Sequence, residues 1–235
     1  MPYYPPQTAY QRLLDWAKDQ HNFIGRKARR EMMGQYGPRA LAEFDARLKG
    51  IGPDDVCLDL GANLGVFTEK LAKTGALVHA YEPDPYAYDI AQERVGHLPN
   101  VVLHNQAVAH QGGTFTMRRS VKFDRKPAAA TGSSTIVFDN PKKFKAEGFD
   151  VTVRAFRDVL ADIGRPVALV KMDIEGAEFD ILRDVFAHPQ DFAIDALFCE
   201  THERSVYAEF AEIDRMRRQS GALAHPYVNL YWPWS

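Results

Sequence analysis

The chain is poor in cysteine and has no long hydrophobic run, and each absence narrows its class. Its 235 residues include only Cys57 and Cys199, each inside a short apolar stretch. This pattern favours buried free thiols in a reducing compartment over a disulfide or a metal site. No apolar run approaches the roughly 18 residues that a membrane-spanning helix needs. The start, MPYYPPQTAY, lacks the regions of a signal peptide. We therefore expect a soluble, cytoplasmic protein.

Neither sign of charge dominates the sequence. There are 29 lysines and arginines against 31 aspartates and glutamates, and the formal net charge is −2. This balance argues against a surface devoted entirely to nucleic acid or anionic lipid. One region differs, because basic residues outnumber acidic ones by eight to four between positions 112 and 150. That region is either a solvated charged loop or a surface that attracts an anionic substrate or carrier.

The order of apolar stretches predicts a doubly wound α/β fold with a mostly parallel sheet. Helices are expected over 8–21 and 26–48, the second divided in two by Gly34, Gly37 and Pro38. Further along, strands (56–60, 76–81, 101–108, 167–172, 194–199) alternate with helices (65–74, 85–95, 155–163, 177–186, 205–218). Inserted β-hairpins are expected from the runs 114–117, 134–138 and 151–153, and the aromatic tail can add an edge strand. The predicted organisation is an N-terminal helical appendage, 1–52, and a main domain, 53–235, with an insert at about 112–153.

A glycine turn follows the first predicted strand. Asp59, Gly61 and Gly65 lie where this strand passes into a helix, so free backbone N–H groups and the missing Cβ atoms admit a ligand. Glu82 ends the next strand, about 20 residues after the first glycine, where a carboxylate reaches ribose hydroxyls. Asn63 replaces the middle glycine of a pyrophosphate fingerprint. The turn therefore suits a nucleoside with an amino-acid tail, such as S-adenosylmethionine, or else is an ordinary strand–helix turn.

A second acidic motif follows the predicted strand 167–172. Asp173 ends this strand, and Glu175 and Glu178 begin the next helix. Ligands of open α/β sheets bind outside the carboxyl ends of the strands, so Asp173 is expected to face the same crevice as Asp59 and Glu82. Glu175 and Glu178 can also be explained as first-turn acids that the helix dipole favours.

Four motifs resemble those of the FkbM family of S-adenosylmethionine-dependent methyltransferases. They are DLGANLG (59–65), YEPDP (81–85), NQAVA (105–109) and KMDIEGAE (171–178), and the resemblance covers roughly residues 55–200. It implies a Rossmann-like, seven-stranded sheet whose final strand is reversed. It also implies O-methylation of a hydroxyl on a sugar, glycan or small natural product.

The resemblance also implies which residues bind the cofactor. They are Asp59, Gly61, Ala62, Asn63, Gly65, Glu82, Pro83, Asp84, Asn105, Gln106, Ala107 and Asp173. In this assignment the glycine turn lines the methionine portion, Glu82 binds the ribose diol, and the other residues flank the adenine or, for Asp173, the sulfonium. Gln106 stands where many methyltransferases have an acid, and its side chain can still hydrogen-bond the exocyclic amine.

A hydroxyl acceptor must lose its proton as its oxygen bonds to carbon. The candidate catalytic bases are Asp173, Glu175, Glu200 and His202, the last two following the predicted strand 194–199. His202 can instead cap the next helix, or it can hold a divalent cation with Asp173 and Glu200, although spacing alone assigns no metal ligand.

The expected partner is a small-molecule or glycan acceptor, with no membrane involved. An RNA methyltransferase, suggested by the basic insert and the basic residues at 26–30, is one alternative. The near-neutral charge and the lack of an N-P-P-[YF] motif argue against it. A non-catalytic scaffold with this fold is the other alternative, and the sequence is compatible with any oligomeric state.

Overall fold

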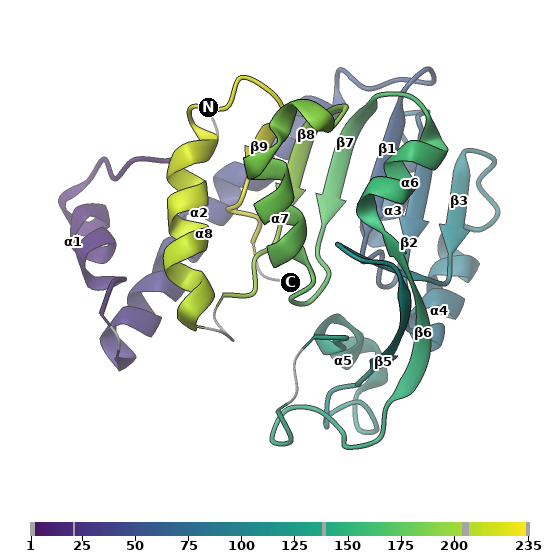
Figure 1. The fold of residues 1–235 in the computed structure, drawn as a ribbon, viewed down its shortest axis with the longest axis horizontal. Coiled ribbons are helices and arrows are strands. Elements are labelled where there is room, and N and C mark those ends of the chain that lie inside the picture. Colours follow the sequence, from purple (N-terminus) through teal and green to yellow (C-terminus); the bar gives the residue numbers. More distant parts are fainter. Residues whose placement is uncertain (1–2, 21, 138–139, 204–206, 234–235) are drawn as a thin grey trace.

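The computed structural model describes residues 3–20, 22–137, 140–203 and 207–233. At its centre is a six-stranded sheet (Figure 1) made of β1 (Val56–Leu60), β2 (Leu77–Tyr81), β3 (Val101–His104), β7 (Val167–Met172), β8 (Ile194–Cys199) and β9 (Tyr227–Asn229). The strand order is β3-β2-β1-β7-β8-β9, and every neighbouring pair is parallel. All five residues of β1 are buried, as expected for a strand covered on both faces.

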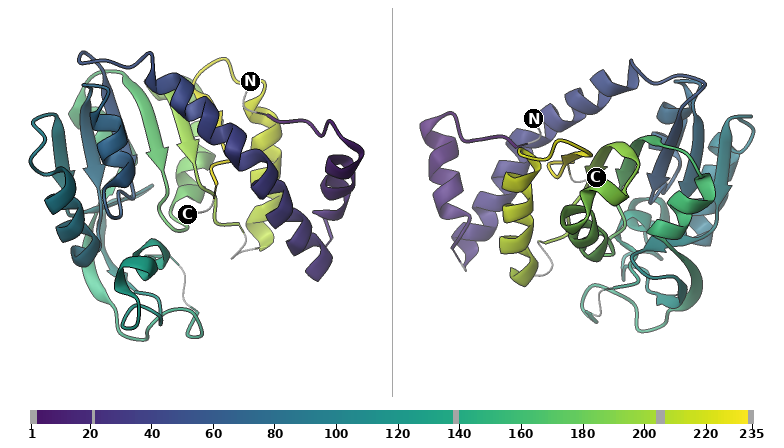
Figure 2. Two further views of the ribbon diagram at one scale, coloured as in Figure 1. Left: turned by 180° about the vertical axis from the view of Figure 1, so that it is seen from behind. Right: turned by 45° about the horizontal axis from the view of Figure 1, so that its top comes forward.

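Helices cover both faces of this sheet (Figure 2). On one face lie α2 (Phe23–Leu48), α3 (Val66–Ala72) and α4 (Pro85–Val95), and on the other lie α6 (Phe156–Ile163), α7 (Glu178–Ala187) and α8 (Tyr207–Ser220). Phe44 and Leu71 belong to the core of the first face, and Val159, Ile181 and Ile213 belong to the core of the second. The short helix α1 (Ala9–Ala17) packs against α2, and η2 (Pro189–Asp191) precedes β8. No helix in the described part of the chain is long and apolar enough to cross a bilayer.

The strand order reverses at β1: β2 and β3 are added on one side of it, and β7 is added on the other side. Ligands of doubly wound sheets bind at such a switch point, outside the carboxyl ends of the strands. Gly61, which follows β1, has a φ of 81°. A Cβ atom added there would lie 1.8 Å from the carbonyl oxygen of Asp173, which follows β7. Glycine therefore lets the two strand ends approach each other closely at the switch point.

A smaller sheet lies beyond the carboxyl ends of the main strands (Figure 1). It contains β4 (Ala107–Ala109), β5 (Gly113–Met117) and β6 (Phe149–Ala155), in the order β4-β6-β5, and α5 (Pro127–Ala130) and η1 (Thr131–Ser133) lie between β5 and β6 in the chain. The Arg119 guanidinium donates to both carboxylate oxygens of Asp84, at 2.8 and 2.5 Å. This bidentate pair fastens the segment between β5 and β6 to the start of α4.

The predicted α/β class, parallel sheet and N-terminal helices are confirmed, but among the described residues the sheet has six strands rather than seven. The aromatic tail adds the edge strand β9, as predicted, yet β9 is parallel to β8 rather than reversed. The helix α8 explains this direction, because a crossover connection returns the chain to the same end of the sheet. After β9 the buried residues Leu230, Tyr231 and Trp232 continue as irregular chain and leave no further strand within the described residues.

Three predicted elements differ from the structure. The helix predicted in two parts over 26–48 is the single helix α2, with Pro38 inside it, because residues on both sides of Pro38 are buried. The predicted strand 101–108 is divided between β3 and β4 in different sheets. Of the predicted strand 134–138, Thr135 forms one isolated bridge with Arg118, and Phe138 lies outside the described residues. The start of the helix predicted over 205–218 also lies partly outside them, at 205–206.

Candidate active site

A pocket of about 560 Å³, including solvent at its mouth, lies between the carboxyl ends of the main strands and the small sheet. Its wall is formed by Gly61, Asn63, Tyr81, Glu82 and Pro83 from the β1 and β2 ends, by Asp173, Ile174 and Glu175 after β7, and by Ala107, Val108, Met117, Thr131, Gly132, Ser134 and Ile136 from the segment between β3 and β6. Its wall combines apolar side chains with a few carboxylates and hydroxyls, as small-molecule sites do.

Glu82 is a buried carboxylate in the wall of this pocket, with a relative exposure of 6%. One carboxylate oxygen accepts from the backbone N–H of Asn63 at 2.8 Å, and the other accepts from that of Asp84 at 2.9 Å. Burial raises the pKa of Glu82 to about 7, although both backbone donors lower it. The backbone thus fixes the carboxylate, whose remaining lone pairs can accept hydrogen bonds from ligand hydroxyls.

Asp59 lies behind the pocket wall and is fully buried. It accepts from the Thr68 hydroxyl at 2.7 Å, and its other carboxylate oxygen lies 3.4 Å from the Lys171 ammonium. Lys171 also donates to the Gly61 carbonyl at 2.7 Å and lies 3.7 Å from Asp173. Burial lowers the pKa of Lys171, but Asp59 and Asp173 outweigh it and the net direction is upward. Lys171 is therefore the cation paired with Asp59, and Asp59 is not among the residues that line the pocket.

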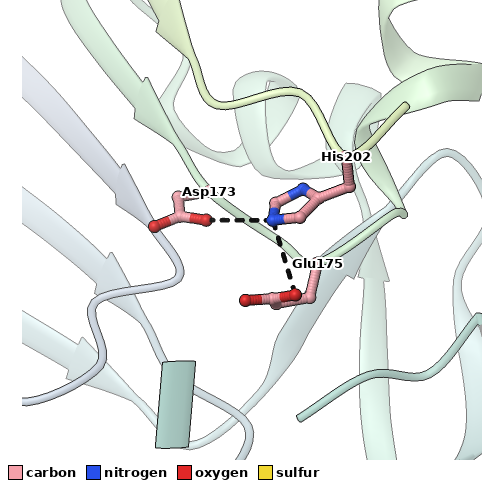
Figure 3. A group of neighbouring side chains, drawn as sticks. All are labelled: Asp173, Glu175 and His202. Atoms are coloured by element: carbon pink, nitrogen blue, oxygen red, sulfur yellow. Dashed lines mark ion pairs between the residues drawn. The ribbon is translucent and has the colours of Figure 1, made fainter. Parts of the chain in front are cut away.

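His202 lies beside the carboxylates of Asp173 and Glu175, which line the pocket (Figure 3). Its Nδ1 lies 2.9 Å from Glu178 Oε1. Its Nε2 faces three further groups, at 3.4 Å from Glu175, 3.7 Å from Glu200 and 3.8 Å from Asp173. Burial lowers the pKa of His202, but the neighbouring carboxylates, Glu178 first among them, raise it well above its usual value.

Two backbone features hold this cluster in place. Glu178 is fully buried, and its carboxylate accepts from the backbone N–H groups of Gly176 and His202, both at 2.8 Å. Glu175 has a φ of 50°, in the left-handed region, and its carbonyl accepts from the Thr135 hydroxyl at 2.8 Å. A side-chain-bearing residue in that region costs about 1–3 kcal/mol and persists only where surrounding contacts enforce it.

The structure separates the predicted site residues into two groups. Those in the pocket wall are Gly61, Asn63, Glu82, Pro83, Ala107, Asp173 and Glu175, with Glu200 and His202 directly behind Asp173 and Glu175. Those outside the wall as described are Asp59, Ala62, Gly65, Asp84, Asn105 and Gln106. Asp84 caps α4 and binds Arg119, and the Asn105 amide donates to the carbonyls of Glu82 and Pro83. These two side chains stabilise the loops around the pocket.

Sequence reasoning missed Lys171 and the link between Glu178 and His202. A signal for Lys171 was present, because a lysine inside an apolar central strand requires a buried partner. In the parallel register of β1 and β7, Lys171 lies opposite Asp59. The Glu178–His202 contact joins positions 24 apart through side-chain orientation, for which the sequence carries no comparable signal.

A second hollow adjoins the pocket between the small sheet and α7. Ile136 lines both, and Gly176 and Ala177 continue the wall directly after Glu175. The rest of its wall is mixed in character and includes His110, Gln111, Phe115, Phe179, Asp180 and Arg183. The carboxylate cluster thus lies near the junction of two cavities of different character.

The sequence matches the family model described as the methyltransferase FkbM domain over residues 59–222. That range includes the end of β1 with its glycine turn, Glu82, the small sheet, the carboxylate cluster and α8. The family match therefore covers both the pocket and the adjoining hollow.

Individual relatives match segments of different length in this chain. The hexuronic acid methyltransferase AglP of Haloferax volcanii is 27% identical over 55% of this chain and 49% of its own, and the 2-O-methyltransferase NoeI of Sinorhizobium fredii is 28% identical over 55% and 57%. A ribosomal RNA small subunit methyltransferase A of Thermotoga neapolitana is 55% identical, but over only 22% of this chain and 20% of its own. The chain thus spans from a fifth to little more than half the length of these relatives.

Proposed function

Because the chain belongs to the FkbM family of methyltransferases, we propose that it transfers a methyl group from S-adenosylmethionine to a hydroxyl of a sugar, glycan or small natural product. One observation carries the proposal. One pocket has the fixed, buried carboxylate of Glu82 in one part of its wall and the carboxylates of Asp173 and Glu175, with His202 beside them, in another. The first suits a ribose diol, and the second suits a hydroxyl that must lose its proton.

The residues of the pocket fit a nucleoside cofactor. Glu82 would accept hydrogen bonds from the ribose hydroxyls, and Pro83 and Ala107 would flank the base. Gly61 and Asn63 offer main chain beside the expected methionine portion, and Asp173 lies next to Gly61 in the wall. When bound, S-adenosylmethionine supplies an activated methyl group, so the protein has to orient the acceptor oxygen and manage its proton.

The second hollow is the proposed acceptor site. Ile136 lines both the hollow and the pocket. Gly176, which lines the hollow, directly follows Glu175, which lines the pocket. His110 and Gln111 in its wall can hydrogen-bond hydroxyls, which suits a sugar better than a wholly apolar molecule. The names of the two longer-matching relatives, a hexuronic acid methyltransferase and a 2-O-methyltransferase, support a hydroxylated acceptor.

The carboxylate cluster is the proposed place for removal of the acceptor proton. Asp173 and Glu175 line the pocket and can receive a proton from a hydroxyl beside them. Burial raises the pKa of Glu175, so its carboxylate binds a proton more tightly than an exposed glutamate does. Glu200 and His202 lie behind these two carboxylates and act on the hydroxyl through them.

The cofactor side of the proposal is tested by Glu82→Ala. Loss of the carboxylate should abolish binding of S-adenosylhomocysteine in calorimetry, whereas Glu93→Ala, on the exposed face of α4, should bind like the wild type. Unchanged affinity in Glu82→Ala would remove the ribose assignment.

The chemical side is tested with radiolabelled S-adenosylmethionine and a panel of uronic acids, neutral sugars and glycans. The wild type should label a hydroxyl of at least one class. Asp173→Asn and His202→Ala should keep their affinity for S-adenosylhomocysteine yet lose turnover, because they act on the acceptor. Equal loss of both properties would place these residues on the cofactor side or in a structural role.

An RNA methyltransferase is the second candidate, favoured by the short match to the ribosomal RNA enzyme and by exposed basic residues in the insert. Phosphate contacts make RNA binding depend steeply on salt. Tight RNA binding that falls steeply between 50 and 200 mM salt, together with methylated RNA, would favour this candidate. RNA affinity that is weak at both salt concentrations would support the hydroxyl acceptor.

A further inference from the structure

Three potential metal ligands converge at the edge of the pocket. Figure 3 shows His202 Nε2 directed toward the carboxylates of Asp173 and Glu175. The separations are 3.8 Å to Asp173 and 3.4 Å to Glu175, and the three ligand atoms all lie within 4.8 Å of one another. At metal–ligand distances near 2.1 Å, octahedral ligand atoms are about 3.0 Å apart when adjacent and about 4.2 Å apart when opposite. We propose that Asp173, Glu175 and His202 bind a divalent cation of the Mn²⁺ type.

The second nitrogen of His202 has the partner that a metal-bound imidazole requires. Glu178 lies 2.9 Å from Nδ1 and also accepts from the backbone N–H of His202. With a carboxylate at Nδ1, one proton stays on that atom, and a cation that binds at Nε2 displaces the second proton that the neighbouring carboxylates favour in the empty site. The imidazole is almost wholly buried, so its direction is fixed by packing as well as by this bond.

The charges around the imidazole favour a cation. Four carboxylates lie within 4 Å of it, those of Asp173, Glu175, Glu178 and Glu200. The Lys171 ammonium lies 3.7 Å from Asp173, but it also lies 3.4 Å from the buried Asp59, so its positive charge is shared between these two carboxylates. Buried carboxylates require compensating charge, and a divalent ion between them supplies it.

The ligand set selects the type of ion and its role. One imidazole and two carboxylates suit Mn²⁺ better than Mg²⁺, which prefers oxygen ligands and retains its waters. Asp173 and Glu175 line the pocket, so the remaining coordination positions face it. This role rests on the proposed function and would replace direct proton transfer to Asp173 or Glu175. With the ion bound, the acceptor hydroxyl would coordinate it, the O–H bond would break heterolytically, and the proton would leave to water while the oxygen keeps the electron pair.

The test uses Mn²⁺ alone, added to the full chain after chelator treatment and removal of the chelator. As Mn²⁺ is added, the electron paramagnetic resonance signal of free Mn²⁺ should stay absent until one ion per chain is bound, and should rise only beyond that point. Asp173→Asn and Glu175→Gln should each weaken binding about tenfold or more, and Glu178→Gln about 10- to 100-fold. Asp195→Asn, a matched loss of charge on the exposed side of β8, should bind like the wild type. Circular dichroism checks that each variant is folded.

Each result decides the proposal. No saturable binding in the wild type overturns it, as does wild-type affinity in both folded ligand variants. If one ligand variant does not fold, the other decides. Calorimetry with S-adenosylhomocysteine on the same metal-free protein keeps the two proposals apart. Cofactor binding without Mn²⁺ binding defeats the metal site alone, whereas Mn²⁺ binding without cofactor binding supports the metal site and defeats the proposed function.

Discussion

At the scale of single residues, Glu82 links the pocket to pH. Its pKa is raised to about 7 by burial, so near neutral pH the empty pocket holds the carboxyl in both protonation states. The ionised form accepts two hydroxyl hydrogen bonds, and the protonated form accepts fewer. Affinity for S-adenosylhomocysteine should therefore be constant above pH 8 and fall below pH 7, by up to about tenfold per pH unit. Calorimetry from pH 5.5 to 8.5 measures this dependence.

The matched control for the Glu82 profile is Glu82→Gln. An amide keeps the shape of the side chain but cannot ionise over this range, so its weaker binding should show no step near pH 7. A wild-type affinity that does not change between pH 8 and 6 would contradict the assignment. So would the same step in the glutamine variant, because another group would then be titrating.

Lys171 gives a second residue-scale prediction, on stability. Its side chain is 3% exposed and is paired with Asp59, which is fully buried. Lys171→Met leaves Asp59 without this cation and should lower the free energy of unfolding by about 3–5 kcal/mol. The exposed pair of Lys70 and Asp45 is the control, because Lys70→Met should cost about 1 kcal/mol or less.

Urea unfolding at pH 7 measures both lysine variants. Adding Asp59→Asn to Lys171→Met removes the uncompensated charge, so the double variant should lose less stability than the sum of the single ones. A cost for Lys171→Met as small as that for Lys70→Met would show that water or another group already compensates Asp59.

The sequence indicated which residues end strands, and this accounts for the part of the site that could be predicted. Glu82, Asp173 and His202 follow buried strands of one parallel sheet, so fold class alone brings them to the same edge. It could not show that Asp59 is turned toward Lys171, behind the wall. That orientation depends on side-chain packing and on which carboxylate acquires a buried cation, properties that a linear pattern does not contain.

At the scale of elements, α2 shows how packing overrides local propensity. Its Gly34, Gly37 and Pro38 predict a break, yet the helix is continuous. Gly34 is exposed and a Cβ added there meets nothing within 4 Å, so Gly34→Ala should stabilise the protein by about 0.5–1 kcal/mol. A Cβ at Gly37 would lie 2.7 Å from the Cβ of Pro233, so Gly37→Ala should destabilise it.

Thermal unfolding followed by circular dichroism compares the two α2 variants. The same helix propensity is gained in both, so a difference in sign isolates the contact with the C-terminal tail. Stabilisation by both alanines would mean that the tail does not pack against Gly37 in solution.

The remaining element-scale errors have the same origin. Buried strands with apolar runs, such as β1, β7 and β8, were predicted with their observed bounds because both faces are covered. The run 101–108 has the composition of one strand, but it turns at Asn105, whose amide binds two carbonyls of the neighbouring loop. A change of sheet depends on that tertiary contact, and composition alone does not reveal it.

At the scale of the whole molecule, α2 and the C-terminal tail meet on one face of the sheet. Trp232 is 2% exposed. The centroid of its ring lies 4.9 Å from the ring centroid of Phe44 on α2, 5.0 Å from that of Phe67 on α3 and 6.0 Å from that of Phe198 on β8. One side chain of the tail therefore joins α2 to α3, the helix that starts at the glycine turn, and to the main sheet.

Trp232→Ala should lower the free energy of unfolding by about 3–5 kcal/mol, because it empties the centre of this aromatic group. Trp16 on α1 is the control: it is 65% exposed, so Trp16→Ala should change stability by no more than about 0.5 kcal/mol. Guanidinium unfolding followed by circular dichroism measures both variants. If the tail and α2 form one cooperative unit with the sheet, Trp232→Ala shifts a single transition to lower denaturant. A separate early transition confined to helical signal would instead show that α2 and the tail unfold apart from the sheet, and would contradict the joining role of Trp232.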